Sequence, residues 1–407
     1  MTGTTGGDVS RSAVRALISR MARSIWFGFV VAVGGGGVVG FSAAMLFGVP
    51  TGFSQPLATF LAGAGALSAG ILAYVNGERS RDLTEAHHQA DMDRERERHR
   101  EDSRRAQESA LRDRYATIAT QIAHDSAAIR QAGVYALTAL ADDWHIFGED
   151  DDRQVCTNLL QWYLRVPFPQ SDEPEEPDLS EREIRQTIVG ILTQRRRRPL
   201  DDPKSWASNS ISLHQVSLPN CEFRSFDLAG LKLFGADLSG ADLSGADLLS
   251  ANLIDAKLTG AKLTGANLFH ATLTYADMSR ANLTNADMNR ANLTSANLTG
   301  AKLTDANMSR ANLTYADLSG ANLTDANLTG ACLTHANLTG ANLAGASLTH
   351  ANLAGANMTE AKLIFAKLTD ADLFDANLTG ANMSGVNMTG IRYNEHTRWP
   401  GGFTPPS

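Results

Sequence analysis

The stretch Ala236-Asp-Leu-Ser-Gly-Ala-Asp-Leu-Ser-Gly245 shows a five-residue pattern that recurs from Ile211 to Gly390. Every fifth residue from Leu213 to Met388 is large and apolar: of 36 such positions, 29 are Leu, six are Met and one is Phe. The residue two places earlier is Ala at all 30 positions from Ala236 to Ala381. A fixed period of this kind decides the fold before any argument from residue propensity begins.

The spacing within each repeat defines an inward and an outward face. Residues two apart lie on the same side of an extended backbone, so the Ala and the Leu face inward together. Because five is an odd number, an uninterrupted strand would turn its apolar face outward at every second repeat. The fifth residue, often Gly, is therefore predicted to be a corner at which the chain changes direction. The chain then keeps turning around its own apolar interior.

The pattern Ala-(Asn/Asp)-Leu-(Thr/Ser)-Gly resembles the pentapeptide-repeat family over residues 211–390. This resemblance implies a right-handed quadrilateral β-helix, a solenoid with one repeat on each of its four sides and therefore nine coils for the 36 repeats. A solenoid has two open apolar ends that need covers. The segment 391–407 resembles the closing segment of the family, and we expect Trp399 and Phe403 to cover the last coil.

Two uncharged stretches precede the repeat. After a polar tail, residues 1–24, the residues 25–47 and 57–75 are each long enough to cross a bilayer, which predicts a transmembrane hairpin over 25–75. Arginines flank its outer ends, so both termini are expected in the cytoplasm. The resemblance to membrane-anchored bacterial proteins, given below for the helical segment, implies that the hairpin lies in a bacterial inner (plasma) membrane. Small residues at every fourth position let helices approach closely, either within the hairpin or between copies in a homo-oligomer.

The segment between hairpin and repeat is predicted to be helical. Residues 76–110 alternate acidic and basic side chains three or four apart, which favours a solvated helical stalk. Residues 111–198 carry several short amphipathic patterns. Within them, Ile129-Arg-Gln-Ala-Gly-Val-Tyr-Ala-Leu137 resembles the HEAT-like helical pairs that precede pentapeptide repeats in membrane-anchored bacterial proteins, which implies a HEAT-like module over 111–198. The run Arg195–Arg198 ends this module and is interpreted as a solvated helix C-terminus, with binding of anionic lipid or nucleic acid as the alternative.

The sequence offers no sign of chemistry. No nucleophile, base and orienting group occur in a recognisable arrangement, so we predict neither an enzyme nor a cofactor. His87, His88 and Asp91 are interpreted as helix surface and not as a metal site. The three cysteines have no metal-binding spacing and no disulfide framework, which fits a reducing compartment.

Two columns of corner residues depart from the monotonous exterior when positions are counted with a period of twenty. The first contains His270, Arg290, Arg310 and His350. The second contains Tyr275, Tyr315 and His335. Arginines on adjacent coils repel one another unless they are solvated or paired with an anion, so the first column is a candidate contact site for an acidic partner. Chance variation at a permissive corner is the open alternative.

A second candidate surface is apolar and lies near the start of the repeat. Its outward residues are Phe234 and Ile254 on one side and Leu249 and Phe269 on the neighbouring side. Exposed apolar patches usually mark contacts. We expect this patch to dock the helical segment 111–198, with self-association as the alternative.

These observations predict a non-enzymatic, membrane-anchored scaffold that presents a β-helical rod to a protein partner in the cytoplasm. Resemblance to the family implies an alternative, because some members protect DNA gyrase by imitating duplex DNA. The repeat 211–390 carries 15 acidic and 10 basic residues, too mild an excess for dense duplex-like charge. Nucleic acid is not an expected partner. A sensor whose hairpin transmits a membrane signal is a further alternative.

Overall fold

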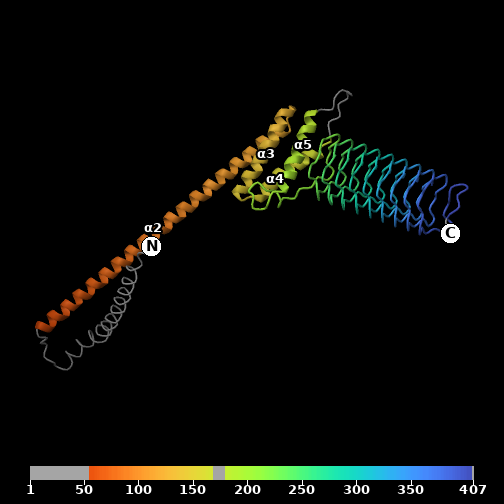
Figure 1. Ribbon diagram of the computed structural model, residues 1–407. Coiled ribbons are helices and arrows are strands. Elements are labelled where there is room, and N and C mark those ends of the chain that lie inside the picture. Colours follow the sequence, from red (N-terminus) through yellow and green to blue (C-terminus); the bar gives the residue numbers. More distant parts are fainter. Residues whose placement is uncertain (1–54, 168–178, 406–407) are drawn as a thin grey trace, which may run out of the picture. The chain divides into compact units, whose positions relative to one another are not determined.

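The computed structural model describes residues 55–167 and 179–405, with side chains from 65 in the first range and from 181 in the second. The chain divides into two compact units, Met1–Ala106 and Gln107–Ser407. In chain order the helices are α2 (Gln55–Ile122), α3 (Ala127–Phe147), α4 (Asp150–Arg165) and α5 (Leu179–Arg196). The repeat follows them (Figure 1).

The described part of the first unit belongs to α2, which is highly charged over the predicted stalk. Oppositely charged side chains three or four residues apart pair along its surface, including Arg94 with Asp91 at 3.1 Å and Arg96 with Asp93 at 3.3 Å. Because these pairs are largely solvent-exposed, each contributes only about 0.3–0.5 kcal/mol to helix stability. Local pairing and not tertiary packing supports this stretch of helix.

The predicted membrane hairpin is not supported. Its first span, 25–47, and the tail 1–24 lie outside the described residues. Its second span, 57–75, falls within α2, which continues without a break into the charged stalk. Among the residues that the structure describes, no helix is both long and apolar enough to cross a membrane.

Helices α3, α4 and α5 pack together, and their buried side chains belong to one core that continues into the repeat. Leu137, Leu160 and Ile188 contribute one fully buried side chain from each helix. Helix α3 ends at Phe147 and is capped by Gly148, whose φ of 90° lies in the left-handed region and whose N–H bonds to the carbonyl oxygen of His145. A short connection then leads directly into α4.

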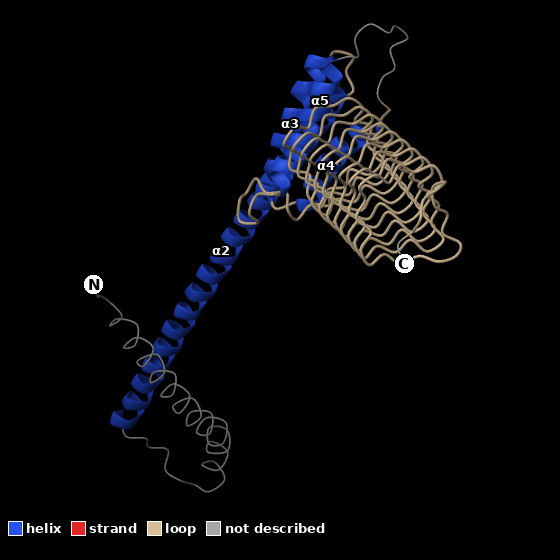
Figure 2. Cartoon of the chain, turned by 45° about the vertical axis from the view of Figure 1, so that its right-hand side comes forward, coloured by secondary structure: helices blue, strands red, loops and turns tan. Residues whose placement is uncertain are grey.

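The repeat folds into a β-helix in which each coil contains twenty residues. Parallel bridges join residues exactly one coil apart, from Ser217 with Asp237 to Asp372 with Arg392. Each side of a coil contributes one bridged residue and no longer strand, which is why Figure 2 draws the coils as loops. In Figure 1 the coils follow one another from green to blue. Four repeats therefore form one coil, and the predicted β-helix is confirmed.

The interior contains the Ala and Leu positions of every repeat. Ala256 and Leu258, for example, are both completely buried. In the first coils larger side chains replace the alanine, and Val216 and Leu231 there are each only 1% exposed. The interior is thus filled by Ala and Leu along most of its length and by larger side chains where the helical module adjoins it.

The fifth residue of each repeat is a corner with positive φ, as predicted. This holds at every such position from Gln215 to Gly390. Gly245 has a φ of 64° and Arg290 a φ of 57°, so the corner keeps its conformation whether or not it is glycine. The N–H of Ala291, just after the corner, closes the turn on the carbonyl oxygen of Met288 at 3.0 Å. The uniform corners make side chains at these positions point outward in register.

The last coil is covered by aromatic side chains. Tyr393 packs edge-on against Trp399, with ring centroids 5.3 Å apart, and Trp399 stacks on Phe403 at 5.4 Å. All three are partly buried against the core of the second unit. They shield apolar side chains that would otherwise face solvent.

Candidate interaction surface

The Asn residues on the sides of the β-helix are committed to holding the backbone. The Oδ1 atom of Asn292 accepts hydrogen bonds from the N–H and the hydroxyl of Thr294, at 3.1 and 2.6 Å. Between coils, Nδ2 of Asn342 donates to Oδ1 of Asn322 at 3.3 Å. Such local bonds fix the residue before each corner. The Asn-rich exterior therefore has a structural explanation that does not involve a ligand.

Aspartates at the same position of the repeat also accept hydrogen bonds from neighbouring residues. Asp277 accepts hydrogen bonds from the N–H of Ser279, the hydroxyl of Thr259 and the amide of Asn297, at 3.0, 2.8 and 3.0 Å. Burial opposes ionisation of this carboxyl, but the hydrogen bonds from Ser279, Thr259 and Asn297 outweigh it and lower its pKa. These acids belong to the framework of the coils, which leaves fewer carboxylates free to face a partner.

The open N-terminal edge of the β-helix is covered by polar groups of the helical module. Gln161 accepts the N–H of Ser212 at 2.7 Å, and Arg165 donates to the carbonyl oxygens of Ser212 and His214 at 3.3 and 3.2 Å. Arg185 donates to the carbonyl oxygen of Ser217 at 2.6 Å. Backbone groups that would otherwise form an unpaired sheet edge are thereby satisfied, and this edge is not a free binding surface.

Each of the four arginines in the run 195–198 forms a contact within this unit, which neither sequence interpretation included. Arg195 pairs with Asp142 at 3.0 Å, and Arg196 donates to the carbonyl oxygen of Ala229 at 2.6 Å. Arg197 pairs with Asp227, and Arg198 with Asp202 at 2.8 Å. The run therefore joins α5 to the first coil and to the turn after the helix, and none of its four guanidinium groups is unpaired.

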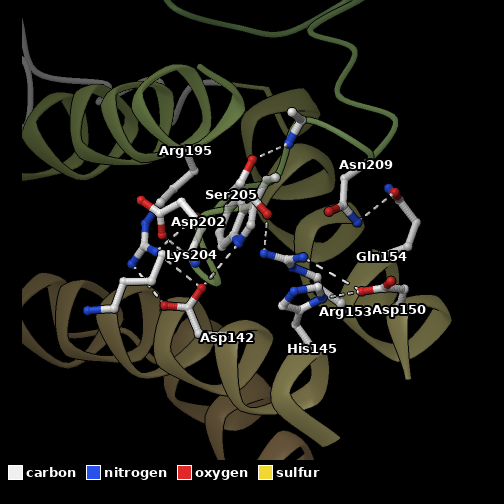
Figure 3. A network of polar contacts seen from close by, with 12 residues as sticks. Asp142, His145, Asp150, Arg153, Gln154, Arg195, Asp202, Lys204, Ser205 and Asn209 are labelled. Atoms are coloured by element: carbon white, nitrogen blue, oxygen red, sulfur yellow. Dashed lines mark hydrogen bonds and ion pairs between the residues drawn. The ribbon is translucent and has the colours of Figure 1, made fainter. Parts of the chain in front are cut away.

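A buried polar network around Arg153 and Asp142 connects α3, α4 and the segment after α5 (Figure 3). Asp142 accepts from the indole N–H of Trp206 at 3.3 Å as well as from Arg195. Arg153 is 1% exposed, pairs with Asp150 at 3.6 Å and donates to the carbonyl oxygen of Ser205. Sequence reasoning missed this network. A signal existed, because Arg153 is three residues before Cys156 and thus shares the buried face of its helix.

The first predicted column is present as an exposed edge of the β-helix. Each of its members is a corner residue with φ between 57° and 58°: His270, Arg290, Arg310 and His350. Arg290 and Arg310 occupy adjacent coils, and neither forms an ion pair within the described part of the chain. His350 lies 3.7 Å from Asp370 of the next coil. The two arginines thus remain available to an external anion.

The second predicted column forms the next edge. Tyr275 and Tyr315 are 63% and 61% exposed, although both are large aromatic side chains. Tyr315 stacks on His335 of the following coil, with ring centroids 5.2 Å apart and an angle of 12° between the ring planes. The structure thus places two aromatic rings one above the other at this edge, with a third, Tyr275, two coils before Tyr315.

The predicted apolar patch is partly exposed, and its role in docking the helical module or in self-association stays a prediction. Phe234 and Leu249 remain 40% and 38% exposed, and Ile254 and Phe269 are partly exposed. The helical module meets the first coils through the edge contacts described above. It also approaches them at Gly190 of α5, where an added Cβ atom would lie 3.7 Å from the ring of Phe226.

The described residues show no arrangement suited to metal chemistry. Across 55–167 and 179–405, no group of three or more His, Cys, Asp or Glu side chains could hold a metal ion. Burial raises the pKa of Cys156 and of Cys221 to about 12, which keeps both thiols protonated. These cysteines behave as core residues.

Comparison with known proteins places the repeat in a family. Pentapeptide repeats are recognised in eight overlapping copies that together cover residues 211–392. The chain belongs to the pentapeptide-repeat protein family. HetL, a pentapeptide-repeat protein of the cyanobacterium Nostoc sp. strain PCC 7120 involved in heterocyst differentiation regulation, is 32% identical over 46% of this chain and 90% of that chain, with a TM-score of 0.23.

Other pentapeptide-repeat proteins of known structure are also similar to this one. A protein of the Arabidopsis thaliana thylakoid lumen is 36% identical over 23% of this chain and 66% of that chain, with a TM-score of 0.23. QnrB1, a plasmid-mediated fluoroquinolone resistance protein, is 20% identical over 44% of this chain and 90% of that chain, with a TM-score of 0.28. None of the curated proteins matches the chain.

Proposed function

We propose that this pentapeptide-repeat protein is a non-enzymatic scaffold that binds an acidic protein partner along one edge of its β-helix. The observation that carries the proposal is the pair Arg290 and Arg310. Their backbones are one coil apart, about 4.8 Å, so their charges repel in the absence of a counter-charge. An acidic partner would relieve this repulsion.

The rest of the surface supports this choice of edge. Side-chain oxygens of the Asn and Asp residues on the sides are engaged by backbone and Thr donors, as at Asn292 and Asp277. Both ends of the β-helix are covered, one by the helical module and the other by Trp399 and Phe403. Specific recognition therefore depends on the corners, where side chains vary and project into solvent.

Imitation of duplex DNA, as a gyrase modulator would require, is less well supported. A DNA mimic needs dense and accessible negative charge. Acidic residues on the sides of the β-helix, such as Asp242 and Asp277, instead accept hydrogen bonds from neighbouring residues of the coils. A supercoiling assay with purified protein tests this alternative directly, and inhibition of gyrase at stoichiometric concentration would favour it over the scaffold.

The membrane anchor, the cytoplasmic orientation, the bacterial inner-membrane location and the pairing of copies stay sequence-based predictions. The scaffold proposal does not depend on them, since its surface lies wholly within the second unit. The sensor hypothesis does depend on the hairpin and has no support from the described residues.

The scaffold proposal is tested by comparing partner capture between the full-length protein and an Arg290→Gly/Arg310→Gly variant. Glycine suits both positions because their φ values are 57° and 58°, so the arginine side chains are removed without straining the corner. Arg280→Gly, at a corner of a different column, is the matched control. We expect an acidic protein to be recovered with the wild type and the control but lost with the double variant. Equal recovery from all three would overturn the proposal.

A further inference from the structure

The two corner columns border one side of the β-helix, which is uncharged in its middle coils. Along the chain this side runs from Arg290 to Ser295 in one coil and from Arg310 to Tyr315 in the next. Between these edges the outward residues are Asn, Thr and Cys: Thr272, Thr274, Asn292, Thr294, Asn312, Thr314, Cys332 and Thr334. A neutral strip thus has a cationic edge on one flank and an aromatic edge on the other. We call it the Arg/Tyr side.

One coil of the aromatic edge, between Tyr275 and Tyr315, carries no aromatic side chain, which leaves a gap. Tyr275 and Tyr315 are separated by two coils, and the corner between them is the small residue Ser295. Two coil steps amount to about 10 Å, so a ring at the level of Ser295 would lie about 5 Å from each tyrosine. This spacing is close to the 5.2 Å that separates the stacked rings of Tyr315 and His335. An external aromatic ring would therefore continue the stack with its existing repeat distance.

The cationic edge is in register with this gap. Arg290 is the corner before Ser295 in the same coil, and Arg310 is the corner before Tyr315. A ligand whose ring lies over Ser295 therefore crosses the neutral strip toward these two guanidinium groups. Aromatic stacking and charge pairing can then act on the same ligand.

The charge distribution limits the length of that ligand. Asp255 precedes Tyr275 on the aromatic edge, while Asp370 and Asp375 follow the last members of the two columns. The whole repeat carries five more acids than bases, with 15 against 10. A long polyanion such as single-stranded nucleic acid would be repelled beyond the two arginines. A short acidic segment matches the positive region in extent.

We propose that the Arg/Tyr side binds a linear peptide segment of a protein partner that combines one aromatic residue with adjacent acidic residues. The aromatic ring inserts between Tyr275 and Tyr315 over Ser295, and the carboxylates pair with Arg290 and Arg310. This assignment rests on the scaffold function proposed above and adds the chemical identity of the recognised motif.

Binding of short synthetic peptides to the full-length protein tests this motif. The probe is fluorescein-labelled Glu-Glu-Trp-Glu-Glu, and Glu-Glu-Leu-Glu-Glu serves as the matched peptide without a ring. Fluorescence anisotropy should show affinity for the Leu peptide to be about tenfold lower, since the Trp ring makes two stacking contacts that Leu cannot make. Labelled oligothymidylate of ten nucleotides should bind more weakly than the Trp peptide. Tighter binding of the oligonucleotide would overturn the assignment in favour of nucleic acid.

A variant that fills the gap separates the ring site from general charge attraction. Ser295→Tyr places a ring at a corner where Tyr275 and Tyr315 show that tyrosine is accommodated, at φ values of 60° and 59°. It should reduce Trp-peptide affinity about tenfold or more and leave thermal stability nearly unchanged. Asn285→Tyr makes the same substitution at an exposed corner of another column and should have no effect on binding.

The outcomes distinguish the two proposals. Equal affinity of wild type and Ser295→Tyr for the Trp peptide, or equal affinity for the Trp and Leu peptides, would overturn the ring site. Loss of acidic-partner capture in Arg290→Gly/Arg310→Gly would still uphold the scaffold in that case. If no peptide bound, the proposed peptide motif would be rejected. The scaffold proposal would stand, because the capture experiment tests it with whole partner proteins.

Discussion

Arg185 donates a hydrogen bond from Nη1 to the carbonyl oxygen of Ser217 at 2.6 Å, while the N–H of Ser217 donates to the carbonyl oxygen of Leu164 at 2.7 Å. One coil later, the carbonyl oxygen of Asp237 accepts from the N–H of Leu218, and the N–H of Asp237 donates to the carbonyl oxygen of Val216. A side chain of α5 and the C-terminal turn of α4 thus take the place of a preceding coil. The β-helix begins on the helical module as if on another repeat.

Loss of this contact should destabilise the second unit strongly. In Arg185→Met the carbonyl of Ser217 loses its donor, and Glu181 loses an ion pair of 2.6 Å at a site where both side chains are almost fully buried. Removing one partner of a buried pair typically costs about 3–5 kcal/mol. Denaturation in urea, followed by circular dichroism, should show this loss in the free energy of unfolding.

The control for this substitution is Arg280→Met, since Arg280 is an exposed corner residue. Its effect on the free energy of unfolding should stay within about 0.5 kcal/mol. Analytical ultracentrifugation adds a second readout, because an uncovered sheet edge promotes association between copies. Equal stability of the two variants would contradict the role given to Arg185.

The repeat was predictable because each of its rules acts within five residues. Inward Ala and Leu and the corner at the fifth position follow from local spacing. The columns with a period of twenty follow from the four-sided coil that the family resemblance implies, and Arg290 could then be aligned with Arg310 by counting. The contacts of the helical module were not predictable in this way. Asp142 and Arg195 are 53 residues apart, and nothing in the local pattern of either names its partner. The gap at Ser295 similarly required the observed stack of Tyr315 on His335.

A second prediction concerns the stability of the packed interior and uses Ala296 and Leu298 of one repeat. Both are buried, at 1% and 0% exposure. Ala296→Leu adds atoms to a space already filled by adjacent coils and should cost about 1–3 kcal/mol. Leu298→Ala leaves a cavity and should cost about 2–5 kcal/mol. Urea denaturation measures both, with Lys302→Ala on the exposed side as a near-neutral control. A neutral Ala296→Leu would mean that the interior has spare room.

Acid should destabilise the β-helix through its framework aspartates. The pKa of Asp277 is lowered because hydrogen bonds to its carboxylate outweigh the effect of burial. A carboxyl with a lowered folded-state pKa contributes stability above its unfolded pKa of about 3.9, and this contribution disappears as the pH falls below that value. Unfolding midpoints in urea should therefore decrease between about pH 5 and pH 2.

Asp277→Asn isolates that contribution. Asparagine is the commonest residue at this position, in 16 of the 36 repeats, and retains the oxygen that accepts from the N–H of Ser279. The variant should show a shallower fall of the unfolding midpoint with decreasing pH than the wild type. Lys257→Asn, at the equivalent position of the preceding coil, leaves the titration of Asp277 in place and should retain the wild-type slope. Identical slopes in all three proteins would contradict the assignment.

The last prediction concerns Gly355, the corner that follows His335 in the aromatic column. A Cβ atom at Gly355 would overlap the imidazole of His335, whereas a Cβ at Gly260 would meet nothing within 4 Å. Both corners have positive φ, 67° and 65°, so alanine at either should cost about 1–2 kcal/mol for backbone strain alone. Gly355→Ala should cost roughly 0.5–1.5 kcal/mol more, because the displaced imidazole loses its stacking on Tyr315. The NMR signals of the His335 ring, assigned with His335→Gln, should shift in Gly355→Ala and stay in place in Gly260→Ala. Equal losses of stability together with unchanged His335 signals would show that the stack of Tyr315 on His335 does not depend on the absence of a side chain at Gly355.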